Sequence, residues 1–147
     1  MKKIIILIIF TLALTANIYS QATTDSSKIP QDIKNKSTVF FEYLMADTVN
    51  FAFSKLLEGS PIAERSSQLD NLIEQTRKSF NVYGMIKGYE FVNAEIVGKS
   101  LIRTRYISLH KNYPLRWIFT FYKTPNSSWI IINVKFDDLT EYFFKDE

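Results

Sequence analysis

The stretch that decides the fold spans residues 116–136 and reads RWIFTFYKTPNSSWIIINVKF. Apolar side chains alternate with other side chains on both sides of the polar segment TPNSS, which is typical of two β-strands joined by a tight turn. The connections GKS and HKNYP separate two further runs of this kind. Because such short connections join antiparallel neighbours, the sequence predicts a four-stranded antiparallel meander. Its strands are expected at residues 85–97, 101–109, 115–123 and 129–136.

The pairing of the last two strands is predicted from side-chain chemistry, since a shift of one residue exchanges the two faces of a sheet. With Tyr122 opposite Trp129, one face is wholly apolar, whereas the shifted pairing would bring Asn133 and Lys135 into it. A buried polar group without a partner costs roughly 1 to 3 kcal/mol, so the first pairing is favoured. It places Trp129 and Ile131 on the outer face. The predicted inner face comprises Leu115, Trp117, Phe119, Phe121, Ile130, Ile132, Val134 and Phe136.

The second strand is predicted to turn its hydroxyl groups inward. Arg103 and Arg105 belong on the outer face, because buried arginines would need charged partners that an apolar face does not offer. The GKS loop, in which Gly98 can adopt a positive φ, then sets Glu95 opposite Arg103. The residues expected inside are Ile102, Thr104, Tyr106 and Ser108.

Helices are predicted before the strands, because apolar residues from residue 31 onward recur at helical spacing. The phase shifts near Asp47, which indicates two short helices with Asp47 as the cap of the second. Gly59, Ser60 and Pro61 mark a stop and a new start, and Gly84 ends a third helix. Helices followed by strands define the α+β class, with three N-terminal helices packed on a curved four-stranded antiparallel meander.

The first residues have the pattern of a secretory signal peptide, with Lys2 and Lys3 before an apolar run and small residues after it. The run is shorter than the ~20 residues of a membrane-spanning helix. Cleavage is expected after Ser20 or Ala22, which predicts an exported bacterial protein, periplasmic or secreted. The predicted organisation is a signal peptide at 1–22, a flexible lead-in at 23–30, a single domain at 31–140 and a C-terminal tail at 141–147.

Charge and composition argue against several function classes. Removal of Lys2 and Lys3 reduces the 18 basic side chains to 16 against 15 acidic ones, a net charge of +1. Without a dense basic run, nucleic acid is not an expected partner. With no cysteine and a single histidine, His110, no cysteine-based or multi-histidine metal site is predicted, and no cofactor is expected. A lone loop histidine is not expected to be catalytic either.

The order of elements resembles the nuclear transport factor 2-like superfamily, a cystatin-like α+β fold. Two stretches carry the resemblance, VYGMIKGYEFV at 82–92 and PLRWIFTFYKTPNSSWIIINVKFDD at 114–138. It covers roughly residues 31–138. More narrowly, the chain looks like the small exported bacterial members of the superfamily. It implies a sheet that curls around the first helix into a cone, with an apolar pocket at its open end. Members of the superfamily bind small molecules or proteins, and some are isomerases or dehydratases, so the fold does not carry one activity across.

Six residues are candidates for lining this pocket: Tyr43, Asp47, Thr104, Tyr106, Ser108 and Trp117. Hydroxyl groups on an apolar wall are usual in ligand sites, although the same hydroxyls can be core groups bonded to backbone or water. Asp47 has the alternative role of a helix cap, and Trp117 that of a core residue. Glu90 and Tyr106 form the alternative catalytic pair, a carboxylate base and an oxyanion donor, if both reach one cavity. Otherwise Glu90 is a solvated charge at a strand end.

The outer face of the sheet is a candidate surface for a protein partner or a homodimer. Arginine and aromatic residues are enriched at such interfaces, whereas the alternative is an amphipathic face in contact with solvent. The candidate residues are Arg103, Arg105, Arg116, Tyr122, Trp129 and Lys135.

The residue patterns therefore favour a non-enzymatic binding module of the cell envelope, for a small apolar ligand or a protein partner. The sequence holds no recognisable nucleophile, metal or phosphate motif. The alternative is an enzyme of the isomerase or hydratase type that uses Glu90 as its base.

Overall fold

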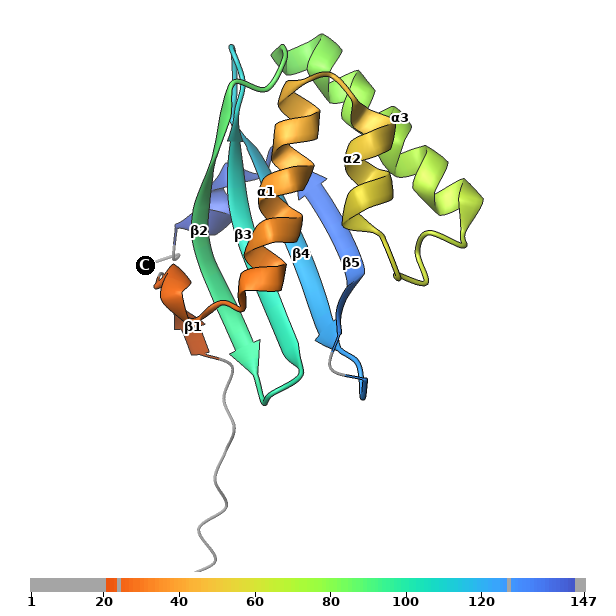
Figure 1. Cartoon of the computed structure of the whole chain (residues 1–147). Coiled ribbons are helices and arrows are strands. Elements are labelled where there is room, and N and C mark those ends of the chain that lie inside the picture. The colour runs from red at the N-terminus through yellow and green to blue at the C-terminus, as the bar shows by residue number, and fades with distance from the viewer. Residues whose placement is uncertain (1–20, 24, 127, 145–147) are drawn as a thin grey trace, which may run out of the picture.

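The fold is a five-stranded antiparallel sheet with helices on one face, seen in a computed structural model that describes residues 21–23, 25–126 and 128–144. Figure 1 shows α1 and α2 lying across the sheet and α3 near its upper end. Three helices precede the long antiparallel strands, so the predicted α+β arrangement is confirmed. The elements are β1 (Gln21–Thr23), η1 (Ser26–Lys28), α1 (Gln31–Met45), α2 (Val49–Leu56), α3 (Ser66–Tyr83), β2 (Gly88–Val97), β3 (Leu101–Leu109), β4 (Leu115–Lys123), β5 (Trp129–Asp137) and η2 (Thr140–Phe143).

The N-terminal segment adds a strand that the sequence did not predict. Gln21–Thr23 pairs with β2 at Ala94 to Ile96, and a turn of 3-10 helix follows at Ser26–Lys28. Ile29 after it is buried, so the segment expected as a flexible lead-in packs against the domain. The predicted signal peptide falls mainly on residues outside the described part of the chain. Cleavage after Ser20 would leave β1 whole, whereas cleavage after Ala22 would cut it.

The break between α1 and α2 lies where the sequence predicted it, but Asp47 plays a different role there. Asp47 has φ of 57°, the left-handed conformation that often ends a helix and that aspartate tolerates better than most residues. The residue at the start of α2 is Thr48, whose hydroxyl donates to the carbonyl of Tyr43 at 2.9 Å. The prediction that Asp47 caps the second helix is therefore wrong, because its backbone turns the chain before the helix begins.

The third helix begins later than Ser60, at Ser66. The Ser60 hydroxyl accepts from the backbone N–H of Ile62 at 3.1 Å and donates to the carbonyl of Ile131 at 2.6 Å. Ser60 thus caps a turn, as a serine before a helix would, and also ties that turn to the outer edge of β5. This long-range hydrogen bond is a tertiary contact that local sequence patterns do not reveal.

The predicted register of β4 and β5 is wrong by one residue near the turn, where Tyr122 lies opposite Ile130, and a β-bulge shifts it once more further along. Lys123 lies opposite Trp129 near the turn, whereas Phe119 lies opposite Val134 further along, with the irregularity between Thr120 and Phe121. The extra residue in β5 switches the alternation of faces partway along the strand. The apolar residues of both halves can then face inward, which no uniform register allows. Buried or packed on the inner face are Trp129, Ile131, Val134 and Phe136.

The predicted inward positions of Ile130 and Ile132 are therefore wrong, and so are the outward positions of Trp129 and Ile131. Trp129 is only 8% exposed, whereas Ile132 is 39% exposed. The prediction holds for Val134 and Phe136 beyond the bulge. The β2–β3 register is as expected, since Glu95 lies opposite Arg103.

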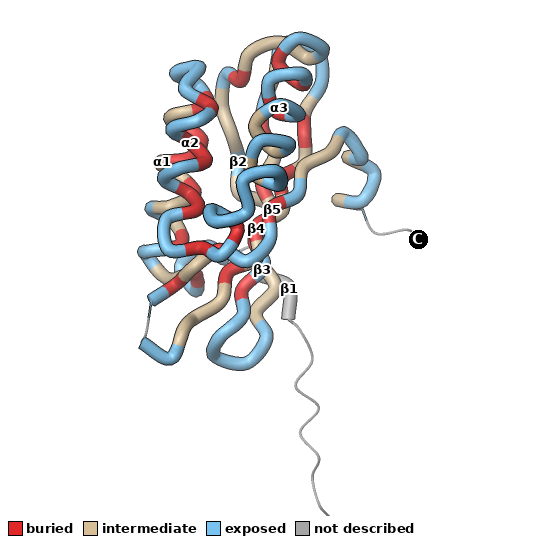
Figure 2. Tube along the Cα trace, turned by 90° about the vertical axis from the view of Figure 1, so that its right-hand side faces the viewer, coloured by how far each residue is buried: buried red, intermediate tan, exposed pale blue. Residues whose placement is uncertain are grey.

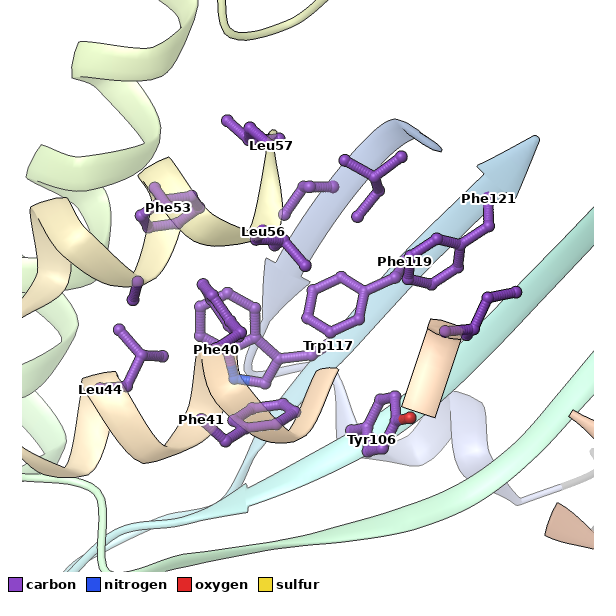
Figure 3. Close-up of a cluster of buried hydrophobic side chains, with 14 of the residues drawn as sticks. Phe40, Phe41, Leu44, Phe53, Leu56, Leu57, Tyr106, Trp117, Phe119 and Phe121 are labelled. Atoms are coloured by element: carbon purple, nitrogen blue, oxygen red, sulfur yellow. The ribbon is translucent and has the colours of Figure 1, made fainter. Parts of the chain in front are cut away.

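The core between α1 and the sheet is a cluster of aromatic rings (Figure 3). Phe40 of α1 lies at its centre, with its ring centroid 5.2 to 5.4 Å from the rings of four neighbours. In Figure 2 the buried parts of α1 and α2 face the sheet, while much of α3 is exposed. Aromatic rings met edge to face contribute beyond their area burial, so this cluster fixes α1 on β3 and β4. The four neighbours are Phe41, Phe53, Trp117 and Phe119.

Candidate ligand pocket

A pocket of about 180 Å³ lies between the first turns of α1, the segment around η1 and the inner face of β2 and β3. Its position follows from the way α1 crosses the sheet, because the aromatic residues of α1 that fill the core lie further along the helix. Near its start, α1 turns Lys34 and Thr38 toward this side. The lining residues are Ser26, Ile29, Lys34, Thr38, Tyr89, Phe91 and Tyr106.

The apolar floor of the pocket consists of three aromatic rings held by their neighbours. Tyr89 stacks on Phe41, with centroids 4.4 Å apart and an interplanar angle of 13°. Phe91 lies opposite Tyr106 in the β2–β3 ladder, and their rings meet edge to face at 5.6 Å. The floor therefore exists before any ligand arrives, as is usual for small-molecule sites.

The hydroxyls of Tyr89 and Tyr106 are the polar groups of this floor, and that of Tyr106 also interacts with Ser37 and Thr104. Tyr106 is 5% exposed, and burial raises the pKa of its phenol, which keeps the hydroxyl protonated at neutral pH. Figure 3 shows Tyr106 at the margin of the core cluster, with its oxygen directed away from Phe40 and Phe41. A neutral phenol can both donate and accept hydrogen bonds.

The remaining wall is polar. Lys34 and Thr38 come from α1 and Ser26 from η1, and Lys34 is the one charged residue among the described residues of the lining. Asp25 lies close by but outside the lining. Its pKa is lowered mainly by hydrogen bonding to the side chain of Ser27 and then to its backbone N–H at 2.9 Å, and the nearby charges of Lys28 and Lys34 lower it further.

Of the six residues predicted to line a pocket, Tyr106 alone lines this one. Thr104, Ser108 and Trp117 are completely buried, and none of the three lines this pocket. The physical reason is that the rings of α1 fill the space above β3 and β4 that the cone was expected to leave open. Thr104 Oγ1 finds no hydrogen-bond partner among the described residues.

The other two predicted lining residues also lie elsewhere. Tyr43 packs edge to face on Phe51, with centroids 4.8 Å apart. Asp47 is exposed and borders a separate, open pocket of about 350 Å³ beside α3, together with Arg77 and Phe80. Neither contributes to the pocket beside β2.

Ser108 belongs to a hydrogen-bond chain that includes His110, a residue to which the sequence assigned no role. His110 Nδ1 lies 2.7 Å from the carbonyl oxygen of Gly84, which can only accept, so Nδ1 carries the proton. Nε2 of the neutral ring then accepts from the Ser108 hydroxyl at 2.9 Å. Ser108 Oγ in turn accepts from Trp117 Nε1 at 2.9 Å. The chain joins the end of α3 to β3 and β4.

This serine and histidine have the spacing of a nucleophile and its base, but their surroundings are those of a structural pair. Ser108 is fully buried, and its oxygen already accepts from Trp117. Burial lowers the pKa of His110, which keeps the imidazole neutral. The signal that sequence reasoning missed was the spacing of Ser108 and His110 across the end of β3.

The proposed catalytic pair of Glu90 and Tyr106 is contradicted by the strand geometry. Glu90 lies opposite Ile107, and its neighbour Phe91 lies opposite Tyr106. Successive residues of a strand point to opposite faces, so Glu90 points away from the pocket, and it is exposed. The two groups do not share a cavity.

The three arginines of the predicted partner surface are paired with carboxylates of the same sheet. Arg105 donates to Glu95 at 2.7 Å, and Arg103 approaches the same carboxylate at 3.4 Å. Arg116 binds Asp137 through two hydrogen bonds of 2.9 and 2.7 Å.

The other predicted residues of this surface are divided between the two faces. Tyr122 is half-buried and Lys135 exposed, and both lie on the outer side, while Trp129 belongs to the core. The Arg116 guanidinium also lies 4.9 Å from the ring centre of Tyr142 in η2. The C-terminal segment therefore folds back against one end of the outer face.

Comparisons with protein-family models, with curated proteins and with solved structures found no match. In the described part of the chain, no helix is both long and apolar enough to cross a membrane. Within the same residues, no group of three or more acidic, histidine or cysteine side chains is arranged to hold a metal ion.

Proposed function

We propose that the protein is an exported, non-enzymatic binding protein that takes a small, largely apolar ligand in the pocket beside β2. The observation that carries the proposal is the floor formed by Tyr89, Phe91 and Tyr106, three rings held in place in a pocket of about 180 Å³. An aromatic ligand that binds on such a floor removes apolar surface from water, and each Å² buried stabilises the complex by roughly 25 cal/mol.

The pocket has the make-up of a recognition site. Its floor is aromatic, and its wall bears the polar side chains of Ser26, Lys34 and Thr38. In ligand sites, a few polar groups of this kind fix the orientation of the ligand. The resemblance to the nuclear transport factor 2-like superfamily and the signal-peptide pattern are compatible with ligand binding in the envelope. A homodimer through the outer sheet face stays a prediction beside this proposal.

The proposal is tested by titrating single-ring aromatic compounds into residues 21–147, which contain every described element, and following backbone amide signals by NMR. We expect shifts centred on Thr38, Tyr89, Phe91 and Tyr106. Thr38→Leu places a larger side chain in the pocket wall and is expected to weaken binding.

The matched control is Thr120→Leu, the same change at a half-buried threonine on the outer face. It is expected to leave the titration unchanged. Binding that shifts only outer-face signals, or that Thr38→Leu leaves intact, contradicts the proposed site.

A further inference from the structure

We propose that the ligand of this pocket is a small monocarboxylate, with one ring or a short chain on the aromatic floor and its carboxylate at Lys34. This inference rests on the proposed function and names the class of ligand for the same pocket. It is drawn from the charge, the arrangement and the size of the lining.

The charge of the lining favours an anion. Lys34 is the one charged residue among the described lining residues, and it is half-buried. The exposed Asp25 carboxylate outside the lining interacts with Lys34 and also with Lys28, so it offsets only part of the charge of Lys34. A partly buried ammonium is less screened by water than an exposed one, and hydrogen bonds between ionised groups are stronger than neutral ones. A single lysine matches the single charge of a carboxylate better than the two charges of a phosphate monoester.

The hydrogen-bond donors are arranged for two acceptor oxygens. Lys34 and Thr38 are four residues apart on α1, so their side chains lie next to each other on one side of the helix. Ser26 of η1, which also bears a hydroxyl, lines the same pocket. A carboxylate presents two oxygens, which can accept from the ammonium and from a hydroxyl at once.

The size of the pocket limits the apolar part of the ligand. An apolar cavity of about 150 Å³ holds a benzene molecule, so this pocket of about 180 Å³ has room for one ring with a short acidic arm. A long fatty acid exceeds it. The floor of three rings suits a flat aromatic body, which aromatic side chains contact face to edge or offset.

The inference is tested with phenylacetate and phenylacetamide, which have the same shape and differ in charge. Their dissociation constants for residues 21–147 are measured by NMR titration at low ionic strength. We expect phenylacetate to bind roughly tenfold more tightly, the effect of one hydrogen bond to a charged group. Lys34→Met keeps the length and apolar stem of the side chain, and should bring the acid to the affinity of the amide.

The matched control is Lys36→Met, since Lys36 is also half-buried on α1 but directs its ammonium toward the carbonyl of Glu58 at 3.5 Å. This variant should retain the preference for the acid. Equal binding of acid and amide to the unmodified protein, or a preference that survives Lys34→Met, would overturn the monocarboxylate proposal and leave the pocket standing. Absence of binding by both compounds, with no difference caused by Thr38→Leu, would overturn both proposals.

Discussion

The two halves of the inner sheet face both carry aromatic residues, but these residues differ in their exposure to solvent. Above β4, Trp117, Phe119 and Phe121 are wholly excluded from solvent. Above β2, Tyr89 and Phe91 remain half-exposed and border a pocket. The difference comes from α1, which covers the first half with Phe40 and Phe41. Over the second half Phe41 stacks on Tyr89, but the polar side chains of Lys34 and Thr38 border the pocket. The helix that faces the strands, rather than the strands themselves, decides where a pocket forms.

The largest effect expected from this comparison is the loss of stability on Phe40→Ala. Phe40 is fully buried and contacts four other rings, so its removal leaves a cavity that rigid neighbours cannot fill. We expect a loss of about 3 to 5 kcal/mol in the free energy of unfolding, measured in urea. Phe91→Ala, at the pocket, should cost under about 2 kcal/mol, since its ring is half-exposed. Equal losses at both positions would contradict the contrast between the two halves.

A second prediction compares the contributions of two buried hydroxyl groups of β3 to stability. Ser108→Ala leaves Trp117 Nε1 and His110 without their shared partner, which should cost about 1 to 3 kcal/mol in unfolding free energy. Thr104→Val removes a buried hydroxyl that forms no hydrogen bond of full geometry and acts only weakly on the Tyr106 phenol, so it should cost less than Ser108→Ala. Urea unfolding of both variants checks the pair, and a larger loss for Thr104→Val would mean that Thr104 has a bonding role.

A third effect concerns ion pairs. Arg116 is 12% exposed and binds Asp137 with two hydrogen bonds, so Arg116→Gln should cost about 1 kcal/mol. Lys78→Gln removes an exposed pair with Glu74 on α3 and should cost less, because water screens exposed charges. Thermal unfolding at low and high salt measures both changes. Similar losses of stability in the two variants would show that burial of the Arg116–Asp137 pair does not strengthen its contribution to stability.

The smallest expected effect is a pH dependence from His110. Because the folded protein holds the pKa of His110 below its usual 6.5, the unfolded chain binds more protons once the pH falls below that value. Stability from this group is thus full above about pH 6.5 and declines as the pH falls toward the lowered pKa. The main cause is burial of the ring, which disfavours the charged imidazolium. A protonated ring would also donate from Nε2, which leaves the Ser108 hydroxyl proton without its acceptor.

This dependence is measured as the free energy of unfolding between pH 7.5 and pH 5.5, above the range in which ordinary carboxyl groups titrate. His110→Gln removes the titrating group and should flatten the slope in that interval. An unchanged slope in this variant would assign the dependence to another group.

The amino-acid sequence determined the elements and most of their pairing. Alternation and turn residues placed β3 and β4 at the observed bounds, and the position of Gly98 gave the β2–β3 register, because these features depend on neighbours in the chain. The need to bury apolar residues also put Arg103 and Arg105 on the outer face. The class of fold followed from the order of helices and strands.

Tertiary structure decided the bulge in β5 and the location of the pocket. The bulge buries Trp129 and Ile131 together with Val134, and this outcome depends on how the whole strand fits under the helices. The pocket depends on how far along α1 its phenylalanines reach over the sheet and on the packing of Ile29 beside it. The sequence indicated Tyr106 as a pocket residue but missed Lys34, Tyr89 and Phe91. A pocket is the space left after segments that are distant in the chain have packed together, and local sequence patterns do not predict that packing.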